Sequence, residues 1–305
     1  MRTDFKKKMI LTFIDMRYTA IIHILIHTIM VDLHCHSFFS DGLLSPEALL
    51  AKAMAAYVSM LALTDHDTTD GLIDLHQAAR GQSIRIINGI EFSARWKLHD
   101  IHIIGLNINP EHEMIQNAIK LQEVSRMKRA QAIGDCFVRL GLPNIYQKAC
   151  DFAGHQRIGR SHYADALVES GVVIDRKQAF KRFLARGKSA YIPTEWLSLA
   201  DVVHVIDKAG GQSVVAHPLK YKLTRTKLQA LISAFKEAGG SGIEVVSGLM
   251  TADEIQYTAD LCHRFELLAS SGSDYHGDSI SRIGLGQQSA LPRQCKPIWQ
   301  QWACH

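Results

Sequence analysis

The sequence lacks the features that mark disulfide-stapled, membrane-spanning and thiolate-metal proteins. Its six cysteines form no C-x-x-C pair among 305 residues, which argues against a zinc ribbon or a disulfide framework and favours reduced thiols in a cytoplasm. No run of about 20 uncharged apolar residues is present, so a membrane span is not expected. With 47% hydrophobic residues, the chain has enough apolar material for one large domain, or for a domain with an insertion.

The first 29 residues differ from the rest of the chain. Three lysines at 6–8 precede an apolar stretch, as in a signal peptide, but Asp15 and Arg17 interrupt that stretch and no small-residue cleavage site follows. A predicted strand begins directly after this segment. We therefore interpret Met30 as the native start and expect residues 1–29 to be an extra segment that is poorly ordered or weakly packed.

Metal-binding side chains gather in five separated fragments, and each fragment follows an apolar, partly β-branched run. The fragments are DLHCH at 32–36 with Asp41, TDHD at 64–67, GIE at 89–91 followed by His102, AHP at 216–218, and SDYH at 273–276. Because side chains alternate faces along a strand, His34 and His36 should point together, as should Asp274 and His276. The pattern predicts that all these side chains lie at the carboxyl ends of strands.

The predicted strands alternate with helical patterns, which indicates a parallel sheet or barrel covered by helices. Ser45 and Pro46 mark the start of one helix. Another helix should begin near Leu199 and end at the glycine pair 210–211. In a β/α barrel the carboxyl ends of the strands carry the active site. The sequence therefore predicts an α/β fold with the metal-binding side chains on the active face.

A basic, helical stretch at 111–188 carries no strand-end ligand, which predicts an insertion between two barrel strands. Residues 120–190 hold 14 Lys and Arg against 6 Asp and Glu, a net charge of +8, whereas the whole chain carries +4. A solvated helical surface remains an alternative explanation. Arg160 and His162 follow a glycine at a predicted helix start, a setting that suits a phosphate group. Lys188 is a candidate for the same cleft.

The fragments together resemble the polymerase and histidinol phosphatase (PHP) superfamily. TDHDTT at 64–69, HIIGLNI at 102–108, LARGK at 184–188, AHP at 216–218 and GSDYH at 272–276 are similar to its TrpH-like branch, which contains bacterial ribonuclease AM. The resemblance implies a distorted (β/α)7 PHP barrel with a helical insertion domain. Its expected parts are a barrel of residues 30–110 and 189–290, the insertion 111–188 and a C-terminal tail 291–305.

The resemblance also assigns the ligands of a metal centre with up to three divalent ions. It places one ion on His34, His36, Glu91 and Asp274, a second on Glu91, His102 and His217, and a third on Asp41, His66 and His276. Lys220 stands where relatives often have arginine, and it precedes Tyr221; both are expected to contact substrate phosphate, the lysine as a point charge.

Imidazole and carboxylate ligands suit Mn²⁺, Fe²⁺ or Zn²⁺, and we expect Mn²⁺ first. A water shared by two such ions becomes a metal-bound hydroxide near neutral pH, which is the expected nucleophile for in-line attack on phosphorus. Asp67, next to His66, is a candidate for orienting a ligand or relaying a proton, and equally for capping a loop.

The resembled branch implies three hypotheses for function. The leading one is a cytoplasmic metal-dependent 5′-3′ exoribonuclease that releases mononucleotides from short RNAs and from the 5′ ends of ribosomal RNA precursors, with Arg160 and His162 on the 5′-phosphate. The second is a 3′,5′-nucleotide bisphosphate phosphatase, and the third is a non-catalytic binding module. The basic insertion favours single-stranded RNA over a small nucleotide as partner. No membrane and no obligate protein partner are expected.

Overall fold

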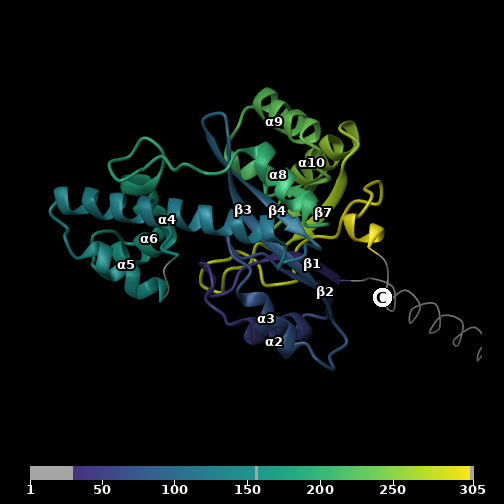
Figure 1. Ribbon diagram of the computed structural model, residues 1–305, viewed down its shortest axis with the longest axis horizontal. Helices are drawn as coiled ribbons and strands as arrows, with labels where there is room; N and C mark the ends of the chain where they lie inside the picture. The colour runs from purple at the N-terminus through teal and green to yellow at the C-terminus, as the bar shows by residue number, and fades with distance from the viewer. Residues whose placement is uncertain (1–29, 155–156, 303–305) are drawn as a thin grey trace, which may run out of the picture.

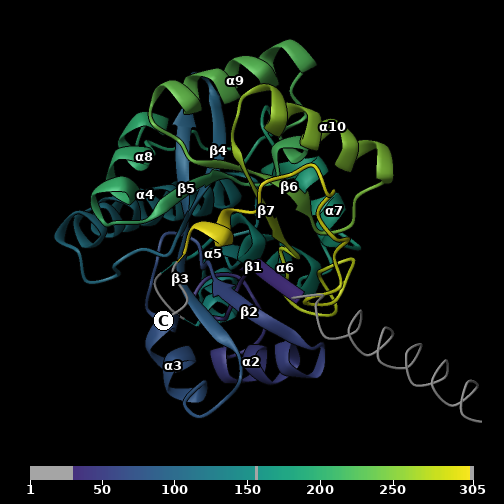
Figure 2. The same cartoon turned by 90° about the vertical axis from the view of Figure 1, so that its right-hand side faces the viewer.

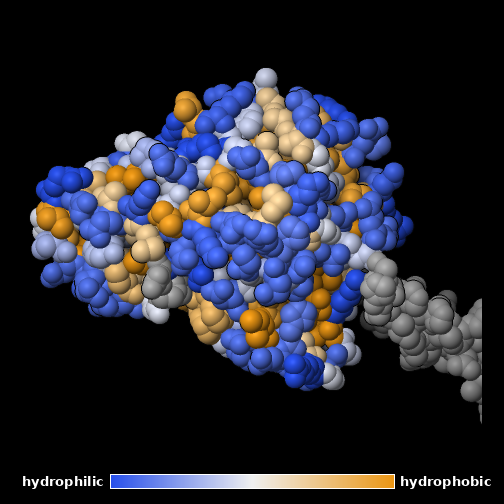
Figure 3. Space-filling view, viewed as in Figure 1, coloured by the Kyte–Doolittle hydropathy of each residue, from blue (hydrophilic) through white to orange (hydrophobic). Residues whose placement is uncertain are grey.

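The computed structural model describes residues 30–154 and 157–302. The expectations for residues 1–29 and for the last three residues of the predicted tail lie outside these ranges. None of the described helices combines the length and the apolar character needed to cross a bilayer. The face shown in Figure 3 is mainly hydrophilic, with apolar side chains in small groups.

A seven-stranded sheet in chain order forms the centre of the molecule. The strands are β1 (Met30–Cys35), β2 (Val58–Leu63), β3 (Arg85–Trp96), β4 (His99–Leu106), β5 (Gln212–Val215), β6 (Gly242–Ser247) and β7 (Leu268–Gly272). The backbone of Cys35 forms a parallel β-bridge with that of Tyr275, and the amide of Asp274 donates to the carbonyl of His34 at 2.8 Å. The first strand thus meets the chain that leaves the last one, and the nearly closed seven-strand barrel confirms the predicted fold class.

β4 departs from the expected parallel order, because it runs antiparallel to both β3 and β5. Its link to β3 contains Lys97 at φ 53° but neither glycine nor asparagine, so the sequence carried no strong hairpin signal. Glu91 lies inside β3 and His102 inside β4. The expectation that every candidate ligand lies at the carboxyl end of a strand is therefore wrong for these two, although the pairing of Ser93 with His102 makes Glu91 and His102 diagonal neighbours on one face.

Helices cover the barrel on opposite sides (Figure 2). One side carries α2 (Pro46–Ala55) and α3 (Gly71–Ala78), and the other carries α8 (Leu199–Lys208), α9 (Arg225–Glu237) and α10 (Ala252–Arg264). The Ser45 hydroxyl accepts from the amide of Ala48 at 3.2 Å, and the Ser198 hydroxyl caps α8 in the same way. These caps confirm the two helix starts predicted from sequence.

A group of helices between β4 and α8 extends away from the barrel (Figure 1). It comprises α4 (Glu113–Arg139), α5 (Ile145–Ala153), α6 (Arg160–Glu169), α7 (Arg176–Ala179) and the π-helix η1 (Phe180–Leu184). These helices share a core of their own, in which Phe137, Tyr163 and Leu184 are fully buried. We propose residues 111–188 as an inserted domain on this basis. Two 3₁₀ turns, η2 (Pro218–Tyr221) and η3 (Ile298–Gln301), complete the described elements.

Candidate metal centre

The nine side chains proposed as metal ligands meet at one mouth of the barrel. Within the described ranges they form four overlapping groups, and in each group one ligand atom per residue lies within 4.8 Å of the others. The groups are His34, His36 and Glu91; His34, His217 and Asp274; His66, Glu91 and His102; and His36, Asp41, His66 and His276. This overlap is the arrangement expected of several cations that share ligands.

Glu91 lies at the centre of this cluster and is completely buried. Its Oε1 lies 3.0 Å from His102 Nδ1 and 2.9 Å from His217 Nε2. Its Oε2 lies 2.9 Å from His66 Nδ1 and 3.4 Å from His34 Nε2. One carboxylate therefore faces imidazoles from four segments of the chain, which suits a ligand that bridges two ions.

Two aspartates also belong to the cluster. Asp274 Oδ1 lies 3.3 Å from His34 Nε2 and 3.4 Å from His36 Nε2. Asp41 Oδ1 lies 3.2 Å from His276 Nε2 and 3.8 Å from His66 Nε2. Each aspartate thus shares a small volume with a pair of imidazoles.

The donor atoms of the cluster fit divalent cations. Asp41 Oδ1, His66 Nδ1 and Glu91 Oε2 are buried and have no hydrogen-bond partner among the described residues. Buried polar atoms are almost always hydrogen-bonded. Here His66 Nδ1 and Glu91 Oε2 lie 2.9 Å apart without hydrogen-bond geometry, and Asp41 Oδ1 lies 3.2 Å from His276 Nε2, so each atom faces another candidate ligand. An imidazole and carboxylate set without thiolates suits Mn²⁺, Fe²⁺ or Zn²⁺.

The charges inside the cluster are strongly coupled. Burial opposes ionisation of Glu91, but His102, His66 and His34 outweigh it and hold the pKa of Glu91 well below its usual value. Burial, followed by the charge of His276, lowers the pKa of His36 to about 3. Glu91 is therefore a carboxylate and His36 a neutral imidazole at physiological pH, which are the protonation states that coordinate metal.

Glu244 supports the cluster from behind and was not identified from the sequence. It is completely buried, its Oε1 lies 2.9 Å from His34 Nδ1, and its Oε2 accepts from the amide of His217 at 2.6 Å. A carboxylate on the outer ring nitrogen fixes the orientation and tautomer of a ligating histidine. The signal was present, because Gly-Ile-Glu at 242–244 repeats Gly-Ile-Glu at 89–91 inside another apolar strand.

Two further buried aspartates hold the loops that carry the candidate ligands. Asp65 accepts from the amide of Ser37 and the hydroxyl of Ser40, both at 2.7 Å. Asp32 accepts from the amides of Ser273 and Gly286, both at 2.8 Å. These bonds fix the loop between His36 and Asp41 and the start of the loop that carries Asp274.

Asp67 connects the barrel to α4. Its carboxylate accepts from the amide of Ser93 at 2.7 Å, from Gln122 at 3.1 Å and from Arg126 Nε at 2.6 Å. Burial opposes its ionisation, but Arg126 and the Ser93 amide lower the pKa of Asp67 below its usual value. Of its two predicted roles, the contacts support loop fixation: the Asp67 amide donates to the carbonyl of Glu91 at 3.0 Å, whereas its carboxylate makes no hydrogen bond to a candidate ligand among the described residues.

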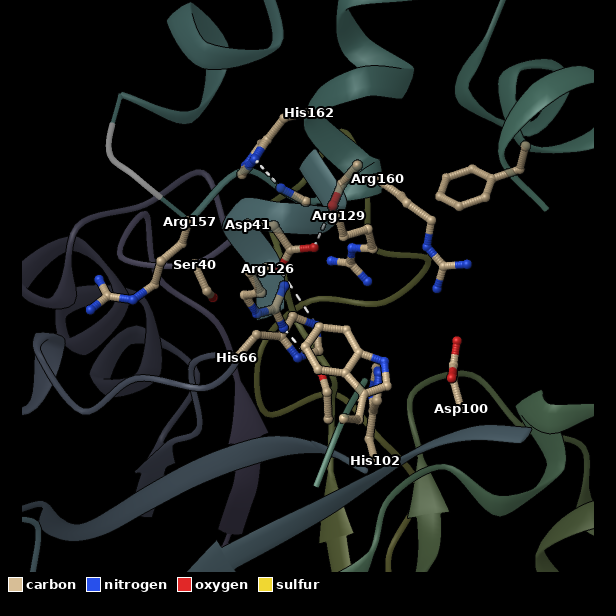
Figure 4. A pocket seen from close by; sticks show the side chains of 15 residues that line it. Ser40, Asp41, His66, Asp100, His102, Arg126, Arg129, Arg157, Arg160 and His162 are labelled. Atoms are coloured by element: carbon tan, nitrogen blue, oxygen red, sulfur yellow. Dashed lines mark hydrogen bonds and ion pairs between the residues drawn. The ribbon is translucent and has the colours of Figure 1, made fainter. Parts of the chain in front are cut away.

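A cavity of about 190 Å³ beside the cluster is lined by four arginines. Figure 4 shows Arg126, Arg129, Arg157 and Arg160 around this cavity, with His66 and His102 on its barrel side. We call it the arginine pocket. Ser161, at the start of α6, donates to Asp41 Oδ2 at 2.7 Å, so the inserted helices touch a candidate ligand directly.

Arg129 is the arginine of this pocket with the least charge compensation. Only 6% of the residue is exposed, and its Nε has no hydrogen-bond partner in the described chain. Burial, Arg126 and Arg160 lower the pKa of Arg129 well below its usual value. Its guanidinium lies 4.7 Å from the centroid of the Trp196 ring. An anion in the pocket would relieve this accumulation of positive charge.

The five residues predicted to contact substrate (Arg160, His162, Lys188, Lys220 and Tyr221) have different surroundings in the structure. Arg160 and His162 line the arginine pocket, but His162 Nδ1 also accepts from the amide of Gly159 at 3.0 Å and so caps α6. Lys220 forms an ion pair with Asp274. Lys188 is exposed and does not line the arginine pocket, so its substrate contact stays a prediction without support from the cavity.

Tyr221 also differs from its prediction. Its hydroxyl donates to the carbonyl of Ala216 at 2.8 Å and accepts from the amide of His102 at 2.9 Å. Both bonds go to the backbone of segments that carry candidate ligands. The tyrosine therefore positions His102 and His217 and has no hydroxyl function left for a phosphate.

Sequence comparison relates the chain to phosphate-ester enzymes. A model of the PHP domain matches residues 32–152. The chain is 39% identical to a 3′,5′-nucleoside bisphosphate phosphatase from Chromobacterium violaceum, over 89% of this chain and 95% of that protein. It is 40% identical to a 5′-3′ exoribonuclease from Haemophilus influenzae, over 89% of this chain and 98% of that protein.

Solved structures show the same architecture. An amidohydrolase from Chromobacterium violaceum, with bound sulfate and no metal, has a TM-score of 0.84 and 39% identity, covering 88% of this chain and 94% of its own. A protein from Bifidobacterium adolescentis assigned as a metal-dependent phosphoesterase has a TM-score of 0.75 and 28% identity, covering 86% and 92%.

Proposed function

The chain belongs to the PHP domain family of metal-dependent phosphoesterases, and we propose that it hydrolyses short single-stranded RNA from the 5′ end. The observation that carries this proposal is the arginine pocket beside the ligand cluster. A phosphate held there stands next to the residues proposed to hold the cations. A terminal phosphate bound in the pocket would therefore lie a short distance from the phosphate that is cleaved.

We propose that the nine clustered residues hold Mn²⁺, as many as three ions, with Glu91 shared between two of them. Bound divalent ions supply Lewis acidity for the phosphoryl oxygens and an activated water. The protein fixes the ligands: Glu244 orients His34, Tyr221 orients the His102 and His217 backbone, and Asp65 holds the loop that leads to Asp41. Rigid positioning of this kind lowers the cost of organising the site during the reaction.

The 5′-terminal phosphate would bind Arg129 and Arg160, with Arg126 nearby. Arg126 is already paired with Asp67, and Arg157 lies 2.8 Å from Asp70. Among the residues that the structure describes, Arg129 and Arg160 form no such ion pair, and they are the arginines best able to accept a new anion. The planar guanidinium group suits two-point contact with phosphate oxygens.

A second candidate function, hydrolysis of 3′,5′-nucleoside bisphosphates, is favoured by the small volume of the arginine pocket and by the 39% identical phosphatase. The two reactions break the same bond. In both, the oxygen of water adds to the phosphorus, the bond between phosphorus and O3′ breaks, and a proton ends on O3′. The product is a nucleoside 5′-monophosphate in either case.

The test is a product analysis of the Mn²⁺-loaded protein with three substrates: a 5′-phosphorylated RNA tetranucleotide, the same RNA with a 5′-hydroxyl, and 3′,5′-bisphosphoadenosine. We expect stepwise release of nucleoside 5′-monophosphates from the phosphorylated RNA, and slower cleavage of the 5′-hydroxyl form. Hydrolysis of the bisphosphate without any RNA cleavage would reverse the order of the two candidate functions.

Arg129→Met should lower kcat/KM for the 5′-phosphorylated RNA by about 10- to 100-fold, because a charged hydrogen bond contributes about 1.5–3 kcal/mol. The same variant should reduce or remove the preference for a 5′-phosphate. Lys120→Met is the matched control, since Lys120 is exposed on the same helix and lies outside the arginine pocket. A 5′-phosphate preference that survives Arg129→Met would contradict this assignment of the pocket.

A further inference from the structure

We infer that a second pocket, which adjoins the arginine pocket at Asp41 and is lined by Asp274 and His276, binds the RNA that lies 3′ of the cleaved bond. This inference rests on the proposed 5′-3′ exoribonuclease function. It names a surface that an RNA substrate would contact and a small bisphosphate would not. The carrying observation is that two adjoining cavities of different size are each lined by different members of the ligand cluster.

The second pocket has a volume of about 570 Å³, against about 190 Å³ for the arginine pocket. It is lined by Asp274 and His276, whereas the arginine pocket is lined by His66 and His102. Asp41, Ser161 and Phe180 line both cavities. The two cavities therefore adjoin at Asp41 and approach the ligand cluster from different directions.

The chemistry of cleavage requires such a second opening. When the first nucleotide and its 5′-phosphate occupy the arginine pocket, the attacked phosphorus is joined to that nucleotide through O3′. The rest of the RNA is joined to the same phosphorus through O5′, so it must leave the cluster by another route. In a 3′,5′-bisphosphate the corresponding oxygen on the phosphorus is terminal, so no further nucleotide follows it.

The lining of the second pocket suits a nucleic acid chain of any sequence. Lys220, Arg176 and Arg282 contribute positive charge, but Lys220 is paired with Asp274 and Arg176 with Asp165. Arg282 is exposed and has no ion pair within the described ranges. Its guanidinium is thus available for a backbone phosphate, a contact that does not depend on base identity.

Apolar side chains complete this lining. Leu249 is 62% exposed, and Ile280 and Ile283 stand in the segment that carries Arg282. Exposed apolar surface beside a cation offers packing for ribose and base edges next to a phosphate contact. The assignment is therefore one phosphate on Arg282, immediately 3′ of the cleaved linkage.

The test compares Arg282→Ala with the unmodified protein on two substrates, a 5′-phosphorylated RNA tetranucleotide and 3′,5′-bisphosphoadenosine. We expect kcat/KM for the RNA to fall about 3- to 10-fold more than kcat/KM for the bisphosphate, the range of an exposed charge contact. Arg293→Ala removes the same charge from an exposed position outside both pockets and should leave the ratio of the two values as it is.

A neutral methylphosphonate at the linkage immediately 3′ of the cleaved one identifies the contact. If Arg282 binds that phosphate, the neutral linkage and Arg282→Ala each slow RNA cleavage, and the two together slow it no more than either alone. Multiplicative effects, or an equal loss on RNA and bisphosphate, would overturn the inference while leaving the exoribonuclease proposal intact. Failure of the unmodified protein to cleave RNA would instead remove the proposed function and this inference with it.

Discussion

Two buried glutamates have different tasks at the candidate metal centre. Glu91 faces imidazoles from four segments, whereas Glu244 holds His34 by its outer nitrogen and His217 by its backbone. Both are completely buried, Glu91 in β3 and Glu244 in β6. The desolvation cost of a buried carboxylate is offset only when its oxygens have charged or hydrogen-bonding partners. We expect cations to be these partners for Glu91, and hydrogen bonds provide them for Glu244.

Glu244→Gln should weaken metal binding without unfolding the protein. The amide retains an acceptor for one of the two bonds, but it no longer supplies a full charge to the His34 ring, and loss of such supporting groups weakens metal binding about 10- to 100-fold. Calorimetric titration of the metal-free protein with Mn²⁺ measures the change. Glu266→Gln, at an exposed glutamate paired with Lys236, is the control; equal affinities of the Glu244 and Glu266 variants would refute this role.

At the residue level the sequence predicted the clustered ligands better than the groups around them. His34, His36, Asp274 and His276 stand out in the sequence because strand alternation predicts that each pair shares one face. In the structure Asp274 and His276 follow β7, and Asp274 has a φ of 52°. Arg126 and Arg129 lie on α4, where two arginines in a basic helix look like a solvated surface. Their burial depends on Trp196, which follows about 70 positions later, and no local pattern connects the three.

At the scale of single elements, the loop after β2 connects the inserted helices to the candidate metal centre. The loop after β2 carries His66 and Asp67 in succession, so the carboxylate that holds α4 is adjacent to a candidate ligand. Asp67 has a φ of 52°, an uncommon conformation for an aspartate. The bonds from Ser93, Gln122 and Arg126 keep it there.

Asp67→Asn should lower the free energy of unfolding by about 3 kcal/mol, because removal of one partner leaves the buried Arg126 guanidinium without its counter-charge. Arg126 and Asp67 are 8% and 1% exposed at the side chain, so solvent screening is small. Urea unfolding of the metal-free protein gives the value, with the exposed Asp207→Asn as control. The double variant Asp67→Asn with Arg126→Met should recover part of the loss. If the single variant Asp67→Asn unfolds with the same free energy as the unmodified protein, the ion pair between Asp67 and Arg126 does not hold α4 to the barrel.

At the element level, helix starts were predictable and the hairpin was not. Ser45 and Ser198 act through bonds to residues three positions away, which a short sequence window contains. The β3 and β4 pairing depends on a register of eight residue pairs and on a turn at Lys97 without a glycine or asparagine signal. The reversal of β4 was therefore outside what local patterns could indicate.

The molecule as a whole joins a nearly closed barrel to a basic set of helices across one mouth. The ligand cluster belongs to the barrel, the arginine pocket lies where α4 and α6 reach it, and Ser161 connects the two through Asp41. Charge is distributed accordingly, with +8 in residues 120–190 and −4 in the remainder. The proposed cation sites of the barrel and the proposed anion site under the helices would thus be complementary parts of one substrate site.

Removal of metal should lower both activity and thermal stability. A ligand at 100 times its Kd stabilises the native state by about 2.7 kcal/mol, and about 2–4 °C accompany each kcal/mol in a chain of this size class. Exhaustive chelation should therefore lower Tm by several degrees and abolish phosphoester hydrolysis, and Mn²⁺ should restore both. The variant His66→Ala with His276→Ala should show little activity in Mn²⁺ and a smaller Tm response, whereas a full response would exclude these residues as ligands.

Anomalous diffraction from a Mn²⁺-soaked crystal tests the metal centre most directly. The predicted result is strong peaks within coordination distance of three sets: His34, His36, Glu91 and Asp274; Glu91, His102 and His217; and Asp41, His66 and His276. No anomalous peak at any of these sets, in crystals of protein whose hydrolysis of RNA survives chelation, would contradict it.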